Sequence, residues 1–149
     1  MSVGEYCNRE VVITKKDTNI CEAAKLMRKH HVGDLVVVEL RGEENIPIGI
    51  VTDRDLVVEV LAQDVPLEAV TVGDVMSTDL ATLREADGLW ETLTQMRSRG
   101  IRRMPVVNDR GGLEGILAVD DVLELLAEGL TDLVGLVKRE LKKEARSRP

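Results

Sequence analysis

The chain has 149 residues, of which 44% are hydrophobic and 32% charged, a composition that suits a folded domain with a sizeable core and excludes fibrous and disordered classes. Phe is absent, and Trp90 and Tyr6 are the only aromatic residues, which excludes a base-stacking surface for single-stranded nucleic acid. The net charge is −7, and residues 138–149 hold six basic and two acidic groups (+4), so residues 1–137 carry −11. An acidic body disfavours nucleic acid or an anionic membrane as the main partner.

Cys7 and Cys21 are too few for a disulfide framework and have no metal-ligand spacing. The first ten residues lack the apolar run of a signal peptide, and the longest apolar runs have four residues. We therefore expect a cytoplasmic protein that does not span a membrane and has no metal site.

An internal repeat organises the chain. A shift of 69 residues matches Val3 and Gly4 with Val72 and Gly73, and Met27 with Met96. Beyond the central strands the shift becomes 66, because the first copy carries three extra residues in a surface loop, where length changes cost little. We expect one copy in residues 1–64, a second in 65–127, and a C-terminal helix with a basic tail in 128–149.

The first copy reads as short strand, helix, strand, strand, helix. Ile20, Ala23, Ala24 and Met27 follow the spacing of a buried helix face, with Thr18 or Asn19 as the N-cap. Buried strands are predicted at 35–38 and 49–51, joined by a loop at 41–47.

The second copy follows a connector at 63–79 and repeats this order. Leu89, Leu93 and Met96 predict its first helix, after Asp87, and the strands fall at 104–107 and 115–117 around a loop at 108–112. Neither copy of about 65 residues is comfortable alone, so the two should pack sheet to sheet about a pseudo-twofold axis. The expected fold class is α/β (α+β).

Beyond Asp121 the pattern is helical. Its apolar residues are spaced 3, 4, 3, 4, as in a coiled-coil seam, and Gly129 and Gly135 interrupt the pattern. Two alternatives stay open: one or two helices that fold back on their own domain, or a helix that packs against a partner chain. The seam consists of Leu123, Leu126, Leu130, Leu133 and Val137.

The segment from Gly49 to Asp55 lies where a strand gives way to a helix. Thr52 could cap that helix and, with the exposed N–H groups of its first turn, bind a phosphate. Asp55 is a suitable acceptor for two sugar hydroxyls. The same Thr-x-x-Asp spacing also fits a capping box that only stabilises the helix.

Four arginines lie within seven residues of an otherwise acidic body. Arg97 and Arg99 suit a solvated helix end, whereas Arg102 and Arg103 lie past Gly100, next to a buried strand. Guanidinium groups in that position are good hydrogen-bond donors to a phosphate.

With these motifs in place, residues 3–127 resemble a pair of CBS domains (the cystathionine beta-synthase repeat), together called a Bateman module. The resemblance is carried by the tandem VGEYC and VGDVM starts, the strand MPVV after IRR, and the turns GIVTDRD and GILAVDD. It implies a sensor that binds adenosine nucleotides or adenosyl compounds in clefts between the repeats and regulates a partner protein.

The resemblance also implies the ligand residues of one cleft. Thr52 would meet phosphate and Asp55 the ribose, Arg102 and Arg103 would also reach phosphate, and the ligand would be AMP, ADP, ATP or an adenosyl compound, with no cofactor required. With no aromatic ring to sandwich the base, affinity should be modest. The remaining expected ligand residues are Gly49, Ile50, Arg54, Ala81, Thr82 and Leu83.

The second cleft departs from the family pattern. Ala118 replaces the hydroxyl residue, and Asp34, in a basic position, would repel a phosphate. We expect this cleft to be empty or to take a ligand without phosphate. Its implied residues are Ile13, Thr14, Gly33 and Asp121.

The sequence is compatible with three functions. The first is a regulatory module that binds an adenosine nucleotide and forms a homodimer, with an unidentified regulated protein as partner. The second is a ligand-free oligomerisation or protein-interaction module. An enzyme is the least favoured: the only histidines, His30 and His31, sit together at a helix end, and no nucleophile or phosphate loop is visible, so no catalytic residue is expected.

Overall fold

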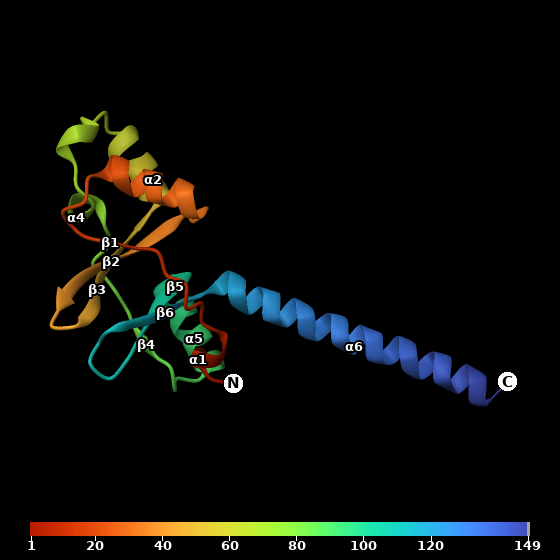
Figure 1. Cartoon of the computed structure of the whole chain (residues 1–149). Helices are drawn as coiled ribbons and strands as arrows, with labels where there is room; N and C mark the ends of the chain where they lie inside the picture. The colour runs from red at the N-terminus through yellow and green to blue at the C-terminus, as the bar shows by residue number, and fades with distance from the viewer. Residues whose placement is uncertain (149) are drawn as a thin grey trace.

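The computed structural model describes residues 1–148, which form two repeats and a long C-terminal helix (Figure 1). The first repeat comprises α1 (Val3–Tyr6), β1 (Ile13–Thr14), α2 (Ile20–His30), β2 (Asp34–Arg41), β3 (Glu44–Thr52), α3 (Asp53–Asp55), the π-helix η1 (Leu56–Leu61) and the 3-10 helix η2 (Leu67–Ala69). The second comprises α4 (Val72–Val75), β4 (Leu83–Arg84), α5 (Leu89–Arg99), β5 (Arg103–Val107), β6 (Leu113–Ala118) and α6 (Val119–Ser147). These elements confirm the predicted mixed α/β class.

Each repeat forms one three-stranded sheet with the same topology. β1 pairs parallel to β2, which pairs antiparallel to β3, and β4, β5 and β6 repeat that order. The two sheets pack on each other through the apolar side chains of Val36, Val38 and Ile116. The strand runs 35–38 and 104–107 are therefore buried on both faces, as their unbroken hydrophobicity predicted.

The predicted helix starts are confirmed, with one error in a buried face. The Asn19 side chain caps α2 by accepting a hydrogen bond from the Cys21 N–H at 2.8 Å. Ile20, Ala23 and Met27 are buried, but Ala24 is exposed, because the buried face of α2 is narrower than its apolar pattern.

The predicted loop at 41–47 is wrong. The strands β2 and β3 continue through it, Arg41 pairs with Glu44, and only Gly42 and Glu43 form the turn. Gly42 has a φ of +63°, which glycine supplies at little cost in a two-residue hairpin turn. The three extra residues of the first copy thus lengthen a hairpin, while the second copy keeps the loop expected at 108–112.

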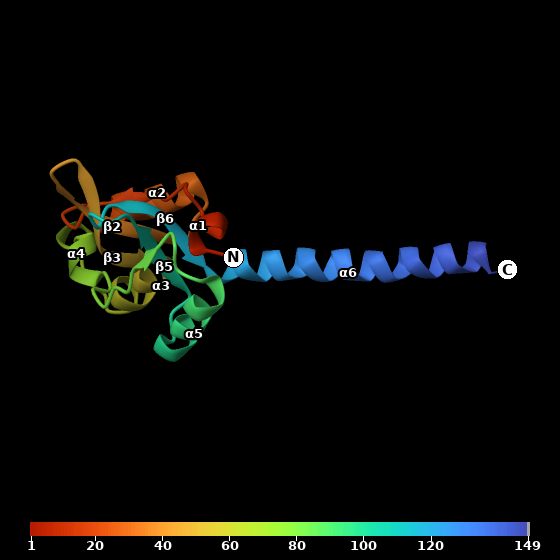
Figure 2. The ribbon, with the colours of Figure 1, turned by 90° about the horizontal axis from the view of Figure 1, so that it is seen from below.

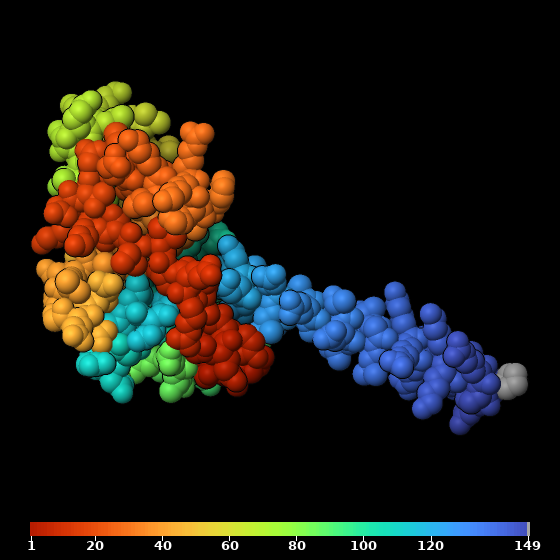
Figure 3. All heavy atoms as spheres, in the orientation of Figure 1, coloured from red at the N-terminus to blue at the C-terminus, as the bar shows by residue number. Residues whose placement is uncertain are grey.

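The opening helices cross between the repeats. Val3 of α1 is fully buried in the core of the second repeat with Leu83 and Leu89, and Val72 of α4 is fully buried in the core of the first repeat with Val37. In Figure 3 the N-terminal residues lie against the second repeat. The segment 63–79 is therefore more than the connector we expected, since part of it completes the first core.

Backbone hydrogen bonds hold both crossings with the same geometry. The Gly4 N–H donates to the Glu85 carbonyl at 2.9 Å, and the Gly73 N–H donates to the Lys16 carbonyl at 2.8 Å. A Cβ at Gly4 or Gly73 would stand 3.0 Å from Glu85 Cβ or from the Lys16 carbonyl oxygen, respectively. The repeated glycines therefore allow two backbones to approach closely.

The helix α6 is continuous over 29 residues, through both glycines. It projects away from the two sheets in both views (Figures 1 and 2). The alternative in which this segment folds back on its own domain is therefore wrong. Within residues 1–148, no helix is long and apolar enough to cross a membrane.

Candidate functional site

A cavity of about 210 Å³ lies between the two repeats at the cleft that the sequence favoured. Ile50 and Thr52 reach it from the end of β3, and Arg102 and Arg103 reach it from the start of β5. Its full lining is Ile50, Thr52, Ser77, Asp79, Leu80, Ala81, Ile101, Arg102 and Arg103.

Both guanidinium groups of the cavity already have carboxylate partners. Arg102 Nη2 lies 3.3 Å from Asp120 Oδ1, in an exposed pair on the second repeat. Arg103 Nε lies 3.1 Å from Asp34 Oδ1, and this pair is partly buried, with the two side chains 31% and 19% exposed. An anion entering the cavity would have to compete with these carboxylates.

Asp34 and Arg103 occupy equivalent positions of the two repeats, 69 residues apart. The ion pair therefore joins the two copies across their pseudo-twofold axis. Burial raises the pKa of Asp34, Arg103 opposes that rise, and the nearby Asp53 adds to it. This carboxylate is thus a poorly solvated charge at the junction of the two repeats.

The turn after β3 forms a capping box. The Thr52 Oγ1 accepts from the Asp55 N–H at 3.2 Å, and Asp55 Oδ2 accepts from the Thr52 N–H at 2.8 Å. The Asp53 N–H donates to the Gly33 carbonyl at 2.9 Å, and the Arg54 N–H donates to the Asp53 carboxylate at 2.8 Å. Of the two alternatives for this turn, the capping box is therefore present, and each first-turn N–H group has an internal acceptor.

Five of the ten residues expected at this cleft line the cavity, namely Ile50, Thr52, Ala81, Arg102 and Arg103. Arg54 and Thr82 are exposed and do not line it, Asp55 closes the capping box, and Leu83 is buried in the second core. Gly49 lies beneath the crossing segment: a Cβ there would stand 2.8 Å from both Met76 Sδ and the Ser77 carbonyl oxygen.

Four lining residues were missed from the sequence: Ser77, Asp79, Leu80 and Ile101. Ser77 reaches the cavity because it exchanges backbone hydrogen bonds with Ile50, which joins the segment after α4 to the edge of β3. Leu80 and Ile101 adjoin predicted residues, but no local pattern indicated that the segment after α4 would contact β3.

A hollow of about 610 Å³ lies on the first repeat, near the position expected for the second cleft. Five of its residues are the 69-residue counterparts of Ser77, Asp79, Leu80, Ala81 and Ile101, but no arginine or lysine lines it, and Glu10 does. Its lining is Asn8, Glu10, Val11, Val12, Ile13, Leu26, His30 and Val32. The lining is largely apolar, with Glu10 and His30 as its ionisable residues; that the second cleft takes no phosphate stays a prediction.

Of the four residues expected in the second cleft, only Ile13 lines this hollow. Thr14 is buried and its hydroxyl lacks a hydrogen-bond partner within residues 1–148. Gly33 offers its carbonyl to the Asp53 N–H, and Asp121 accepts from the Ala118 N–H at 3.2 Å and faces a different hollow at the root of α6. In the described part of the chain, no group of three or more His, Cys, Asp or Glu could hold a metal ion.

Comparisons with known proteins agree with this architecture. The CBS domain family matches residues 3–62 and 72–128. The uncharacterized protein MK0525 of Methanopyrus kandleri is 36% identical over 143 residues, covering 96% of this chain and 69% of that protein. The CBS domain-containing protein YhcV of Bacillus subtilis is 34% identical over 121 residues, covering 81% of this chain and 82% of that one.

A solved structure extends the likeness to three dimensions. The crystal structure of the CBS domain pair of protein MJ0100, in complex with 5'-methylthioadenosine and S-adenosyl-L-methionine, superposes with a TM-score of 0.75 at 25% identity, covering 87% of this chain and 98% of that one. The two family segments coincide with the two repeats that share one sheet topology. This chain therefore belongs to the CBS domain family and is a tandem pair of CBS domains.

Proposed function

We propose that this CBS pair is a regulatory module that binds AMP or a related adenosyl compound in the cavity between its repeats and signals its occupancy to a partner protein. The observation that carries the proposal is a cavity of about 210 Å³ in which Thr52 of the first repeat faces Arg102 and Arg103 of the second. A ligand there touches both repeats at once, so its binding changes how firmly they are held together.

The size and charge of the cavity favour a small ligand. At about 210 Å³, the cavity is smaller than the usual ligand pocket of about 300 to 1,000 Å³. It therefore suits AMP or an adenosyl thioether better than ATP. Its two arginines are paired with Asp120 and Asp34, and Asp79 also lines it. The cavity therefore lacks the excess positive charge that a triphosphate needs. The crystal structure of the MJ0100 pair with two adenosyl compounds supports the ligand class.

A binding panel tests the proposal. AMP, ADP, ATP, 5'-methylthioadenosine and S-adenosyl-L-methionine are titrated against the chain by calorimetry and thermal shift. A ligand at one hundred times its Kd adds about 2.7 kcal/mol of stability, which is roughly 5 to 10 °C in Tm for a chain of this size. We expect AMP or an adenosyl thioether to give this shift and ATP a smaller one.

A matched pair of variants locates the site. Arg102→Ala should abolish the shift with AMP, whereas Arg97→Ala, which removes an exposed arginine of α5 outside the cavity, should leave it unchanged. If none of the compounds binds, or if both variants behave alike, the cavity is not the ligand site.

An interaction function is the second candidate, and the exposed apolar side chains of α6 favour it. It does not require a ligand. If the chain associates with a protein but binds no adenosine compound, the interaction function is supported. If it binds an adenosine compound and this binding changes its association with a protein, the regulatory function is supported.

A further inference from the structure

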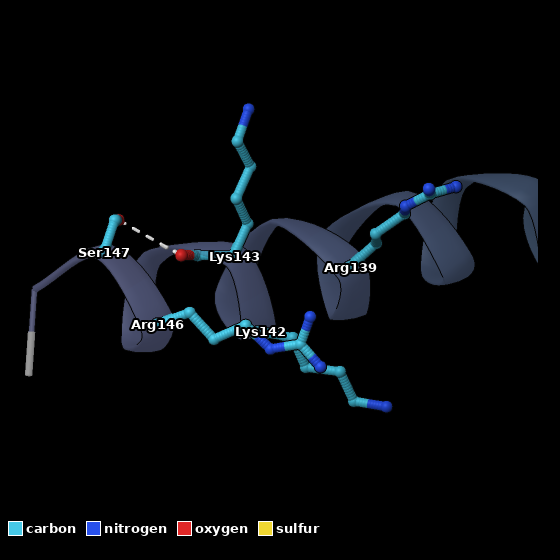
Figure 4. A pocket seen from close by; sticks show the side chains of 5 residues that line it. All are labelled: Arg139, Lys142, Lys143, Arg146 and Ser147. Atoms are coloured by element: carbon cyan, nitrogen blue, oxygen red, sulfur yellow. Dashed lines mark hydrogen bonds between the residues drawn. The ribbon is translucent and has the colours of Figure 1, made fainter.

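The cavity between the repeats has more carboxylates than cations around it. Arg102 and Arg103 line it together with Asp79, and Asp120 and Asp34 each pair with one of the two arginines. The other concentration of basic side chains lies on the last turns of α6 (Figure 4), a helix that projects away from the two sheets. Within residues 1–148, no further cation lines the cavity to meet an anionic ligand.

Asp34 does not line the cavity, but it adjoins two residues that do. It is paired with Thr52 in the register of β2 and β3, and directly paired residues project from the same face of a sheet, with Cβ atoms about 5 Å apart. Its Oδ1 lies 3.1 Å from Nε of Arg103. A phosphate that contacts both Thr52 and Arg103 is therefore placed beside the Asp34 carboxylate.

One neighbour alone favours the ionised form of Asp34. Within residues 1–148, the charged groups that face this carboxylate are Arg103 of β5 and Asp53 of α3. The Asp53 carboxylate lies against Gly33, where a Cβ would stand 3.0 Å from Asp53 Oδ2. The Asp34 side chain is only 19% exposed, so water solvates its charge poorly. Its ionisation therefore depends on the guanidinium group of Arg103.

We propose that Asp34 sets the ligand selectivity of the cavity, an inference that rests on the function proposed above. A ligand phosphate on Arg103 leaves Asp34 beside an anion, and the carboxylate then takes up a proton from solvent. A ligand without a phosphate leaves the ion pair in place and needs no proton. Displacement of Asp34 from Arg103 and sharing of the guanidinium group have the same consequence, because both bring a second negative charge to this place.

The selectivity therefore changes with pH. A bound phosphate raises the pKa of Asp34, because an anion opposes the charge that Arg103 stabilises. The affinity gained from the proton is fully present below the pKa of the free protein's carboxyl, and it is lost as pH rises through the raised pKa of the complex. One linked proton changes the affinity by at most about tenfold per pH unit. High pH thus favours phosphate-free adenosyl compounds.

The first test counts the protons taken up with each ligand. Calorimetric titrations are run at a series of pH values in buffers of different ionisation enthalpy, since the dependence of the observed enthalpy on the buffer gives the number of protons bound. With AMP, we expect the natural chain to take up as much as one proton more than Asp34→Asn does. With 5'-methylthioadenosine, which has no phosphate, we expect the two proteins to take up equal numbers.

Two controls isolate Asp34 in this comparison. The phosphate of AMP has a pKa of its own at about 6, but it titrates with both proteins and is removed by taking their difference. Asp109→Asn deletes the same charge from an exposed pair with Arg84 on another surface, and it should keep the proton count of the natural chain.

The second test needs no ligand. The carboxyl carbon of Asp34 is titrated by nuclear magnetic resonance in the natural chain and in Arg103→Gln. Loss of the guanidinium group should raise the pKa of Asp34, because burial and Asp53 then act unopposed. Arg102→Gln is the matched control and should leave this titration unchanged, since Arg102 pairs with Asp120. The same measurement on the natural chain with saturating AMP should also show a raised pKa.

The outcomes separate this proposal from the proposed function. If AMP binds the natural chain and Asp34→Asn with equal proton uptake, the cavity binds its ligand but Asp34 does not set the selectivity. An Asp34 titration that is the same in Arg103→Gln as in the natural chain overturns the proposal whether or not AMP binds. If neither AMP nor 5'-methylthioadenosine binds either protein, the proposed function is wrong and the selectivity falls with it.

Discussion

The ion pair between Asp34 and Arg103 predicts that the proposed binding of AMP depends on a residue outside the cavity. At an N–O distance of 3.1 Å, with charge centres about 4 Å apart, the attraction is about 4 kcal/mol at an effective dielectric constant of 20. Solvent at the two partly exposed side chains screens this attraction to about 1 to 2 kcal/mol. The desolvation of Asp34 exceeds the attraction, since burial raises the pKa of this carboxyl despite Arg103. A phosphate that binds Arg103 must overcome this interaction.

Asp34→Asn should therefore strengthen AMP binding by about five- to thirty-fold, the equivalent of 1 to 2 kcal/mol. Calorimetric titration measures the change, with 5'-methylthioadenosine as the control ligand, because it has no phosphate and its affinity should stay constant. Asp109→Asn is the matched control variant: it removes the same charge from an exposed pair with Arg84 on another surface. An AMP affinity that is unchanged or weaker in Asp34→Asn would refute the reasoning.

The pH dependence follows from the direction of the pKa shift. Burial raises the pKa of Asp34, so the folded chain holds this proton more tightly than the unfolded chain does. The stabilisation that this uptake gives is present at low pH and is lost as pH rises through the raised pKa. Asp34→Asn should thus cost little stability at neutral pH, and its advantage in AMP affinity should shrink as pH falls and the natural carboxyl becomes neutral.

Five further substitutions, grouped in three tests, probe the fold by chemical denaturation and amide exchange. Gly49→Ala should cost about 1 to 3 kcal/mol, because its Cβ would press on the crossing segment, whereas Gly129→Ala on exposed α6, with nothing within 4 Å, should be neutral or stabilising by up to about 1 kcal/mol. Val3→Ala should cost about 2 kcal/mol and reduce amide protection mainly in the second repeat, while Val72→Ala should do so mainly in the first; equal loss in both repeats would contradict the crossing. Thr52→Ala should cost about 1 kcal/mol through its lost cap, and a denaturation midpoint equal to that of the natural chain would show that the cap is not needed.

The repeat and the local patterns determined much of this protein. Two segments related by a shift of 69 and then 66 residues were expected to adopt similar structures. The apolar spacing of 20–27 and the unbroken apolar run 35–38 were sufficient for a helix and a buried strand. The same patterns selected Thr52, Arg102 and Arg103, which line one cavity. They succeeded because each depends on neighbours within a few residues.

Contacts between distant segments were decided only by the tertiary structure. The crossing of Val3 and Val72 into opposite cores, the close packing over Gly49 and the pairing of Asp34 with Arg103 join residues about 30 to 115 positions apart. No periodicity records which of two similar copies a segment will pack against. The sequence by itself therefore specified the two halves and their helices. The packing of one half on the other decided which polar groups line the cavity and which carboxylates already pair with them, because these contacts join residues far apart in the chain.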